Sequence, residues 1–182
     1  MAAWLEGGTD VVQLRSKTLS RGPLLELAAE LARLCAEGGA LFVVDDQVDV
    51  ALLSGADGVH LGPDDLSVPA ARRVAGDRLL IGASASTPAA AREAEAAGAD
   101  YLGSGPAYTT PFKREKRVIG PAGVAEIAAA VRIPVFAIGG VERQRIPELR
   151  RAGVDRVCAI RALADAPDPR AEAHRFRQAL LA

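Results

Sequence analysis

The sequence passes from a glycine turn into a short apolar run at Gly55-Ala56-Asp57-Gly58-Val59-His60-Leu61-Gly62. The turn has the form Gly-x-Asp, and the same form precedes apolar runs at Gly98-Ala99-Asp100 and Gly153-Val154-Asp155. Each copy follows a helical pattern, so we expect each one to end a helix and to lead into a strand. Repetition of helix and strand along the chain indicates a parallel sheet.

Apolar runs of strand length occur seven times along the chain. They show little alternation of apolar and polar residues, which is typical of strands that are covered on both faces. Helical patterns lie between the runs, for example at residues 24–36, 87–97 and 143–152. The seven predicted strands are residues 11–15, 41–44, 58–61, 79–82, 101–103, 134–138 and 156–160.

An open doubly wound sheet and a closed (β/α)₈ barrel both fit this order of strands and helices. Polar residues at the C-terminal ends of different strands favour the barrel, because a barrel brings all these ends to one mouth. These residues are Gln13, Arg15, Asp45, Asp46, Asp65, Ser84, Gly139 and Gly140. We therefore predict that residues 1–182 form one TIM (β/α)₈-type barrel domain. Residues 1–8 are typical of the end of a helix, so we expect the barrel to be short at its N-terminus and to lack the first strand.

Composition and charge argue against several classes of protein. Twenty-two basic and 23 acidic residues leave a formal net charge of −1, which does not suit binding to nucleic acid or to an anionic membrane. No apolar stretch reaches the length of a membrane span, and we expect no secretion signal. Cys35 and Cys158 suggest neither a disulfide framework nor a metal site, and His60 and His174 suggest no triad. We expect a cytoplasmic protein with small-molecule partners, and the sequence is compatible with a homo-oligomer.

Two pairs of carboxylates follow neighbouring strands, at Asp45-Asp46 and at Asp64-Asp65. Carboxylates at neighbouring strand ends can share a hard cation such as Mg²⁺, whose other ligands are phosphate oxygens and water. This favours Asp46 and Asp65 as metal ligands. The alternative is that Asp64 and Asp65 cap the helix that begins near Ser67.

Three further segments suit an anionic ligand. Gln13, Arg15 and Lys17 alternate at a strand end, although a frayed strand end would also explain them. Residues 105–117 form a basic, hydroxyl-containing segment that can bind phosphate or can be a solvated surface loop. Gly139-Gly140 can bring backbone amides to a phosphate, or can serve only as a tight turn.

Several of these motifs, taken together and in order, resemble the thiamine phosphate synthase family, which shares a superfamily with the TenI-type thiazole tautomerases. The resemblance runs from about Gly7 to the C-terminus. The motifs that carry it are Val12 to Lys17, Val44 to Asp49, Ala56 to Leu66, Gly82 to Ser84, Gly98 to Gly103, Thr110 to Lys113 and Ala137 to Gly140.

The resemblance implies a transferase that joins an aminopyrimidine methyl diphosphate to a thiazole phosphate and releases diphosphate. It implies that the pyrimidine diphosphate is held by Gln13, Arg15, Lys17, Asp45 and Lys113, with Ser84 on the pyrimidine side. It implies Mg²⁺ on Asp46 and Asp65, and a thiazole phosphate site at Thr110, Phe112, Gly140, Ile160 and Arg161. Arg15 and Lys113, with Mg²⁺, would neutralise the leaving diphosphate, so they and Ser84 are the expected catalytic residues.

The chain also departs from the usual pattern of that family. Asp45 stands where the family usually has Asn, Phe112 where it has Thr, Ser86 where a His is common, and Arg161 where a Ser is common. Two alternatives therefore accompany the synthase hypothesis, namely a thiazole tautomerase and a non-catalytic protein that binds phosphorylated ligands. Retention of Arg15, Lys17, Asp46, Asp65 and Lys113 argues against the tautomerase, which does not need the part of the site that binds diphosphate and metal.

Overall fold

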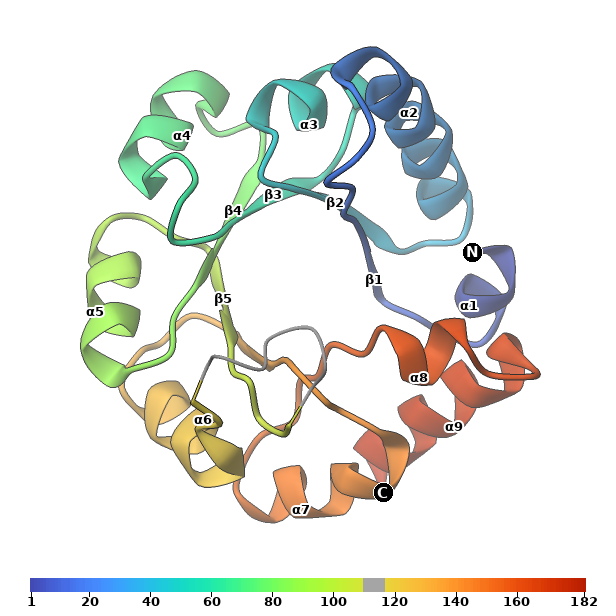
Figure 1. Cartoon of the computed structure of the whole chain (residues 1–182), viewed down its shortest axis with the longest axis vertical. Helices are drawn as coiled ribbons and strands as arrows, with labels where there is room; N and C mark the ends of the chain where they lie inside the picture. The colour runs from blue at the N-terminus through green and yellow to red at the C-terminus, as the bar shows by residue number, and fades with distance from the viewer. Residues whose placement is uncertain (110–116) are drawn as a thin grey trace.

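A curved, wholly parallel sheet with helices on its outer side forms the protein, seen in the computed structural model of residues 1–109 and 117–182 (Figure 1). Neighbouring strands follow the order of the sequence, because each strand pairs in parallel with the next. The described residues form six strands: β1 (Val11–Leu14), β2 (Leu41–Asp45), β3 (Gly58–Leu61), β4 (Leu80–Ser84), β5 (Tyr101–Ser104) and β6 (Val135–Ala137).

Helices connect the strands and cover the convex face of the sheet. The helices are α1 (Ala2–Glu6), α2 (Arg21–Glu37), α3 (Val48–Ser54), α4 (Val68–Ala75), α5 (Pro88–Ala96), α6 (Gly120–Ala129), the 3₁₀ helix η2 (Arg143–Arg145), α7 (Ile146–Arg151), α8 (Arg161–Ala164) and α9 (Pro169–Leu181). Strand–helix–strand connections of this kind generate a TIM-like architecture. The predicted helix at 143–152 is split into η2 and α7, with Pro147 in the first turn of α7.

Alternate residues of each strand point to opposite faces of the sheet. The outward-pointing set packs with the helices in the hydrophobic core and includes Val12, Phe42, Val44, Val59, Leu61, Ile81, Ala83, Leu102, Val135 and Ala137. By the same alternation, the concave face carries Asp45, His60, Ser84, Tyr101 and Phe136, which lie on five neighbouring strands or their ends. The concave face is therefore the polar and aromatic side of the sheet.

A glycine on β4 makes room for an aromatic ring on this concave face. Gly82 and Tyr101 are register partners on β4 and β5, and a Cβ atom at Gly82 would lie 2.1 Å from Cζ of Tyr101. The Tyr101 ring therefore lies directly over Gly82. Phe136 on β6 makes an edge contact with Tyr101, with ring centroids 5.7 Å apart.

The seventh predicted strand, residues 156–160, is wrong as a strand. Within the described residues this segment forms an isolated parallel bridge, Ala137 with Val157, beside the three-residue strand β6. Ile160 already serves as the N-cap of α8, and it is 66% exposed. No strand of the described chain pairs with this segment on the side away from β6.

The Gly-x-Asp turns hold the N-terminal ends of the strands. Asp57 accepts a hydrogen bond from the backbone N–H of Phe42 at 2.7 Å, and Asp100 accepts one from Ile81 at 2.7 Å. Asp155, in the third copy of the turn, forms an ion pair with Arg156. Two of the three aspartates thus fix the start of a neighbouring strand.

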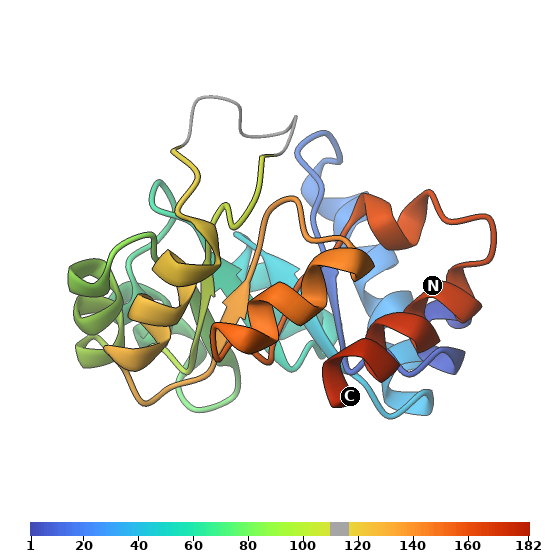
Figure 2. The same cartoon turned by 90° about the horizontal axis from the view of Figure 1, so that it is seen from below.

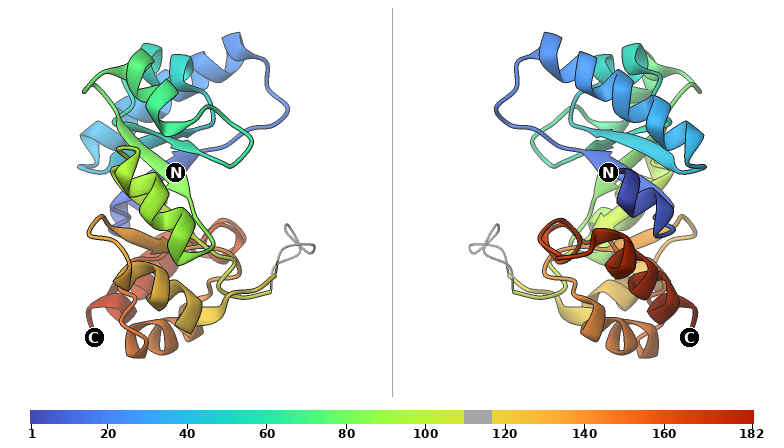
Figure 3. Two further views of the ribbon diagram at one scale, coloured as in Figure 1. Left: turned by 90° about the vertical axis from the view of Figure 1, so that its left-hand side faces the viewer. Right: turned by 90° about the vertical axis from the view of Figure 1, so that its right-hand side faces the viewer.

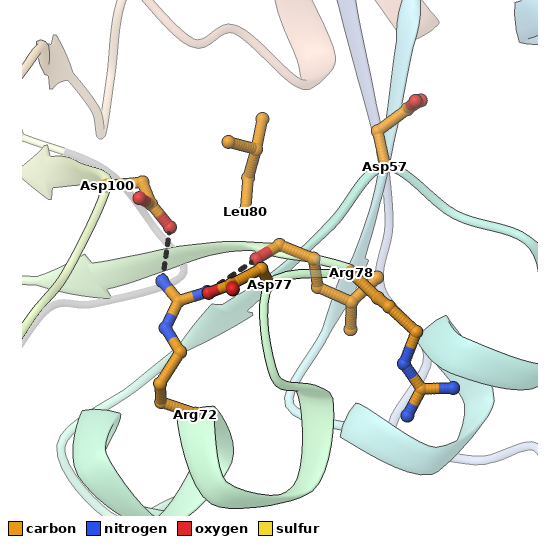
Figure 4. A pocket seen from close by; sticks show the side chains of 7 residues that line it. Asp57, Arg72, Asp77, Arg78, Leu80 and Asp100 are labelled. Atoms are coloured by element: carbon orange, nitrogen blue, oxygen red, sulfur yellow. Dashed lines mark hydrogen bonds and ion pairs between the residues drawn. The ribbon is translucent and has the colours of Figure 1, made fainter.

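A cavity of about 450 Å³ lies beside these turns, at the N-terminal ends of β3, β4 and β5 (Figure 4). Arg72 projects from α4 across it, with an ion pair to Asp100 at 2.7 Å and hydrogen bonds to three backbone carbonyls. The N-terminal end of a barrel of parallel strands serves stability, whereas active sites form at the C-terminal end. We therefore assign this cavity and Arg72 to the framework of the fold.

The loops that follow β1, β3 and β6 all project from the opposite, C-terminal side of the sheet (Figure 2). The two ends of the chain are brought together, because α1 packs against α9 (Figure 3) and Trp4 donates a hydrogen bond to the Leu163 carbonyl. None of the described helices has the length and apolar character needed to cross a membrane.

Candidate active site

Asp46 and Asp65 are brought together from the ends of β2 and β3. Asp46 directly follows β2, and Asp65 lies in the loop after β3, where it accepts a hydrogen bond from the Gly62 N–H at 2.8 Å. Burial and a hydrogen bond to Asp46 raise the pKa of Asp65. The pKa of Asp46 is lowered instead, because hydrogen bonds with Asp65 and Lys17 outweigh the effect of its burial. Opposite shifts of this kind are expected where two carboxyl groups share one proton.

Asp46 also has an unusual backbone conformation. Among the described residues it is the only one other than glycine with a positive φ, at 66°. Its N–H donates a hydrogen bond to the His60 carbonyl at 2.8 Å, which ties the turn after β2 to β3. Left-handed conformations cost energy in residues with a side chain and are concentrated at functional sites. This turn places the Asp46 carboxylate beside Asp65.

Two cations from the segment after β1 approach Asp45 and Asp46, the adjacent carboxylates at the end of β2. Lys17 forms a hydrogen-bonded ion pair with Asp46, and this contact raises the pKa of Lys17. Nε of Arg15 lies 2.9 Å from Oδ2 of Asp45. Both cationic side chains are 55% exposed, so each remains accessible to an anion from solvent. Gln13 lies on β1 and is exposed.

Asp45 is a buried carboxylate at the C-terminal end of β2. Its side chain is 9% exposed. Arg15 is close enough to Oδ2 for an ion pair, but no described residue donates a well-aligned hydrogen bond to that atom. Burial and the neighbouring Asp46 raise the pKa of Asp45 to about 6, and Arg15 only partly offsets this. In the folded protein Asp45 is thus protonated at a pH at which it is ionised in the unfolded chain.

We expect Asp45 to make the folded state less stable as the pH rises. Its folded-state pKa of about 6 lies above the unfolded value of 3.8, so its contribution is most favourable below pH 3.8 and is lost as the pH rises through 6. The Asp45→Asn variant should therefore gain in melting temperature over wild type between about pH 4.5 and about pH 7.5. Asp155→Asn, at an exposed ion pair, is the control and should show no such trend. If the difference in melting temperature between Asp45→Asn and wild type stayed constant across this pH range, the raised pKa of Asp45 would be contradicted.

The mouth of the concave face also contains Ser84, at the end of β4. Nε2 of His60 lies 3.0 Å from Oγ of Ser84, and Nδ1 of His60 lies 3.3 Å from the Tyr101 hydroxyl. Burial raises the pKa of Tyr101, so its hydroxyl stays protonated. Sequence reasoning gave His60 no role. The signal was present in the sequence, since His60 is a polar residue inside an apolar strand, two positions after Gly58.

The Gly139-Gly140 turn contacts the segment that follows β5. Both glycines have positive φ, and a Cβ atom at Gly140 would lie 2.7 Å from the Thr109 carbonyl oxygen. The Gly139 carbonyl accepts a hydrogen bond from the Tyr108 N–H at 3.0 Å. The predicted phosphate-binding residues Ile160 and Arg161 lie at the start of α8. Thr110, Phe112 and Lys113 lie outside the described residues, so their predicted roles stay predictions.

The carboxylates of Asp46 and Asp65 suit a hard divalent cation, although they are only two ligands. Within residues 1–109 and 117–182, no group of three or more His, Cys, Asp or Glu side chains is arranged to hold a metal ion. The carboxyl groups of Asp46 and Asp65 nevertheless lie close enough to shift each other's pKa. Mg²⁺ is commonly held by one or two carboxylates together with phosphate oxygens, so these two side chains could hold it. The alternative role for Asp65 as a helix cap is wrong, because Ser67 caps α4.

Comparison with known proteins points to one family. The chain matches the sequence model of a family described as thiamine monophosphate synthase over residues 1–163. The thiamine-phosphate synthase of Haloquadratum walsbyi is 45% identical over 178 residues, which cover 96% of this chain and 80% of that protein. The thiamine-phosphate synthase of Prochlorococcus marinus (strain MIT 9313) is also 45% identical over 178 residues, or 98% of this chain and 50% of that protein. This chain thus spans about half the length of several curated relatives, and most of the length of others.

Solved structures agree with this result. The thiamine phosphate pyrophosphorylase from Pyrococcus furiosus is 40% identical and superimposes with a TM-score of 0.93, covering 99% of this chain and 87% of that one. A 3-hexulose-6-phosphate synthase, 21% identical with a TM-score of 0.74, shares the fold; the match covers 98% of this chain and 93% of that one.

Proposed function

The chain belongs to the thiamine monophosphate synthase family, and on that premise we propose that it joins an aminopyrimidine methyl diphosphate to a thiazole phosphate. The products are thiamine phosphate and diphosphate. One observation carries the proposal: Arg15, Lys17, Asp46 and Asp65 come from three different segments and converge at the C-terminal ends of β1, β2 and β3.

Two cations are placed to bind the diphosphate. Arg15 and Lys17 form ion pairs with Asp45 and Asp46 but stay more than half exposed, so both can exchange or share their partner with a diphosphate oxygen. Hydrogen bonds between such cations and phosphate are strong because both groups are charged. We assign diphosphate binding to Gln13, Arg15, Lys17 and Lys113, although Lys113 lies outside the described residues.

Asp46 and Asp65 would hold Mg²⁺ between the protein and the diphosphate. When bound, Mg²⁺ would neutralise part of the negative charge that develops on the leaving diphosphate. The carbon–oxygen bond of the pyrimidine substrate breaks, its electron pair leaves with diphosphate, and the thiazole nitrogen forms the new carbon–nitrogen bond. The chain would accelerate the reaction mainly by orienting the two substrates and by stabilising the charge on the leaving diphosphate.

Asp45 distinguishes this site from the usual family pattern, because it adds a carboxylate beside the diphosphate position. A buried carboxylate near an anionic substrate is repulsive, and Arg15 is the side chain that offsets it at 2.9 Å. We assign the thiazole phosphate to Gly140, Ile160 and Arg161 together with Thr110 and Phe112. A cytoplasmic location, a homo-oligomer and a TIM (β/α)₈-type barrel that lacks its first strand stay predictions, and the curved parallel sheet supports the barrel.

The direct test is product formation by the purified chain. The protein is mixed with both phosphorylated substrates and Mg²⁺, and thiamine phosphate is measured by mass spectrometry beside a blank without protein. We expect thiamine phosphate and diphosphate in equal amounts, and neither when Mg²⁺ is removed with a chelator. No product above the blank would contradict the proposed function, and turnover of the thiazole substrate alone, unchanged in Asp46→Ala, would favour a tautomerase.

A further inference from the structure

His60 lies between two hydroxyl groups on the concave face of the sheet. Its Nε2 atom is 3.0 Å from Oγ of Ser84, and its Nδ1 atom is 3.3 Å from the hydroxyl of Tyr101. The three residues come from β3, β4 and β5, which are neighbours in the sheet (Figure 1). Family membership and the proposed metal site leave this arrangement unexplained.

Packing fixes the position of the imidazole ring. His60 is 8% exposed, and its ring centroid is 5.6 Å from that of Tyr101. Gly103 on β5 leaves space for the ring, since a Cβ atom there would lie 3.1 Å from Cε1 of His60. A ring held on two sides cannot turn freely, so its two nitrogens keep separate partners.

Two arrangements of hydrogen bonds satisfy these contacts, because either nitrogen of the His60 ring can carry the proton. A neutral imidazole donates from one nitrogen and accepts at the other. In one arrangement the Tyr101 hydroxyl donates to Nδ1, which leaves the proton of the imidazole on Nε2. Nε2–H then donates to Oγ of Ser84. Because Ser84 accepts from the ring, its own hydrogen is directed away from His60 toward the mouth of the site.

We propose that His60 is a positioning residue which, through Nε2–H, orients the Ser84 hydroxyl to donate a hydrogen bond to an acceptor atom of the bound pyrimidine substrate. This inference rests on the proposed function, in which Ser84 lies on the pyrimidine side of the site. Such a substrate carries one amino donor, but its ring nitrogens and diphosphate oxygens, which are the greater number of its polar atoms, are acceptors. A serine fixed as a donor therefore matches the substrate, whereas a serine that donates to the histidine offers it only lone pairs.

Substitutions of His60 separate this role from a packing role. A glutamine amide can place an N–H near the position of Nε2, whereas the shorter asparagine can reach only the position of Nδ1. We expect His60→Asn to lower kcat/KM for the pyrimidine substrate about tenfold, as for one lost hydrogen bond, and His60→Gln to restore most of the loss. In a Ser84→Ala background, His60→Asn should have no further effect, because His60 acts through Ser84.

The contrary results are equally clear. The proposal is overturned if His60→Asn keeps wild-type kcat/KM while folded, or if the effects of His60→Asn and Ser84→Ala multiply. Thermal melting of each variant shows whether it folds. If His60→Asn does not fold, His60→Gln and Tyr101→Phe replace it: a folded His60→Gln with kcat/KM as low as that of Ser84→Ala, or wild-type kcat/KM in a Tyr101→Phe variant whose ring has shifted to the Nδ1–H tautomer, would overturn the proposal.

Nuclear magnetic resonance tests the hydrogen bonds without any activity. The chain has two histidines, so His174→Gln assigns the ring signals of His60. Long-range ¹H–¹⁵N correlation should show the Nε2–H tautomer in the wild-type protein and a mixture of tautomers in Tyr101→Phe. An Nδ1–H tautomer in an active enzyme overturns the His60 inference alone. An Nε2–H tautomer in a protein that makes no thiamine phosphate contradicts the proposed function and the substrate role of Ser84, and leaves only the hydrogen-bond arrangement.

Discussion

We expect Asp46→Asn to retain about one hundredth or less of the wild-type kcat/KM for thiamine phosphate formation. Asp46 is the residue that contacts both Asp65 and Lys17, so its replacement removes a metal ligand and an ion pair together. An asparagine is similar in size but carries no charge, and it is a weak ligand for Mg²⁺. Steady-state kinetics at saturating Mg²⁺ measures the loss.

Asp64→Asn is the matched control for this prediction. Asp64 is exposed and lies one residue before Asp65, so it has the same chemistry and nearly the same sequence context. We expect it to keep wild-type kinetics. Equal activities for Asp46→Asn, Asp64→Asn and wild type would show that the carboxylate pair does not serve catalysis.

A large loss of stability is expected from Gly82→Ala. The new Cβ atom would lie 2.1 Å from Cζ of Tyr101, so the aromatic ring must leave its place on the concave face. Overpacking of this kind costs about 2–3 kcal/mol of unfolding free energy. Chemical denaturation with urea measures the change.

A control and a rescue make the origin of this loss clear. A Cβ atom at Gly22 would meet no other atom within 4 Å, so Gly22→Ala should leave the stability nearly unchanged or slightly raised. Removing the ring with Tyr101→Leu should make Gly82→Ala much less costly in the double variant. If the two costs simply added, the clash with Tyr101 would not be their source.

The strand pattern of this protein could be predicted from the sequence because the strands are short apolar runs between helical segments, and because Gly-x-Asp turns precede β3 and β5. Six of the seven predicted strands are confirmed within a residue or two at either end. The error at residues 156–160 has a physical cause, since this run meets only the three-residue strand β6 and leads at Ile160 directly into α8. That information is not local to the run.

The convergence of Asp46 and Asp65 could also be predicted, because parallel strands bring their C-terminal ends to the same edge. The contacts of His60 could not, although its place in an apolar strand marks it as unusual, since they depend on the ring of Tyr101 and on the space left by Gly82 and Gly103. The pKa of Asp45 was equally inaccessible, because it reflects how deeply the fold buries one of two adjacent carboxylates.

The most direct test of a joint cation and diphosphate site is a titration with Mn²⁺ followed by electron paramagnetic resonance, in the presence of inorganic diphosphate. We expect one Mn²⁺ to bind per wild-type chain, more tightly with diphosphate than without it. Asp46→Asn and Asp65→Asn should lose this binding, and Asp64→Asn should keep it. The account would be contradicted if Asp46→Asn and Asp65→Asn bound Mn²⁺ as tightly as wild type, or if wild type bound Mn²⁺ equally well with and without diphosphate.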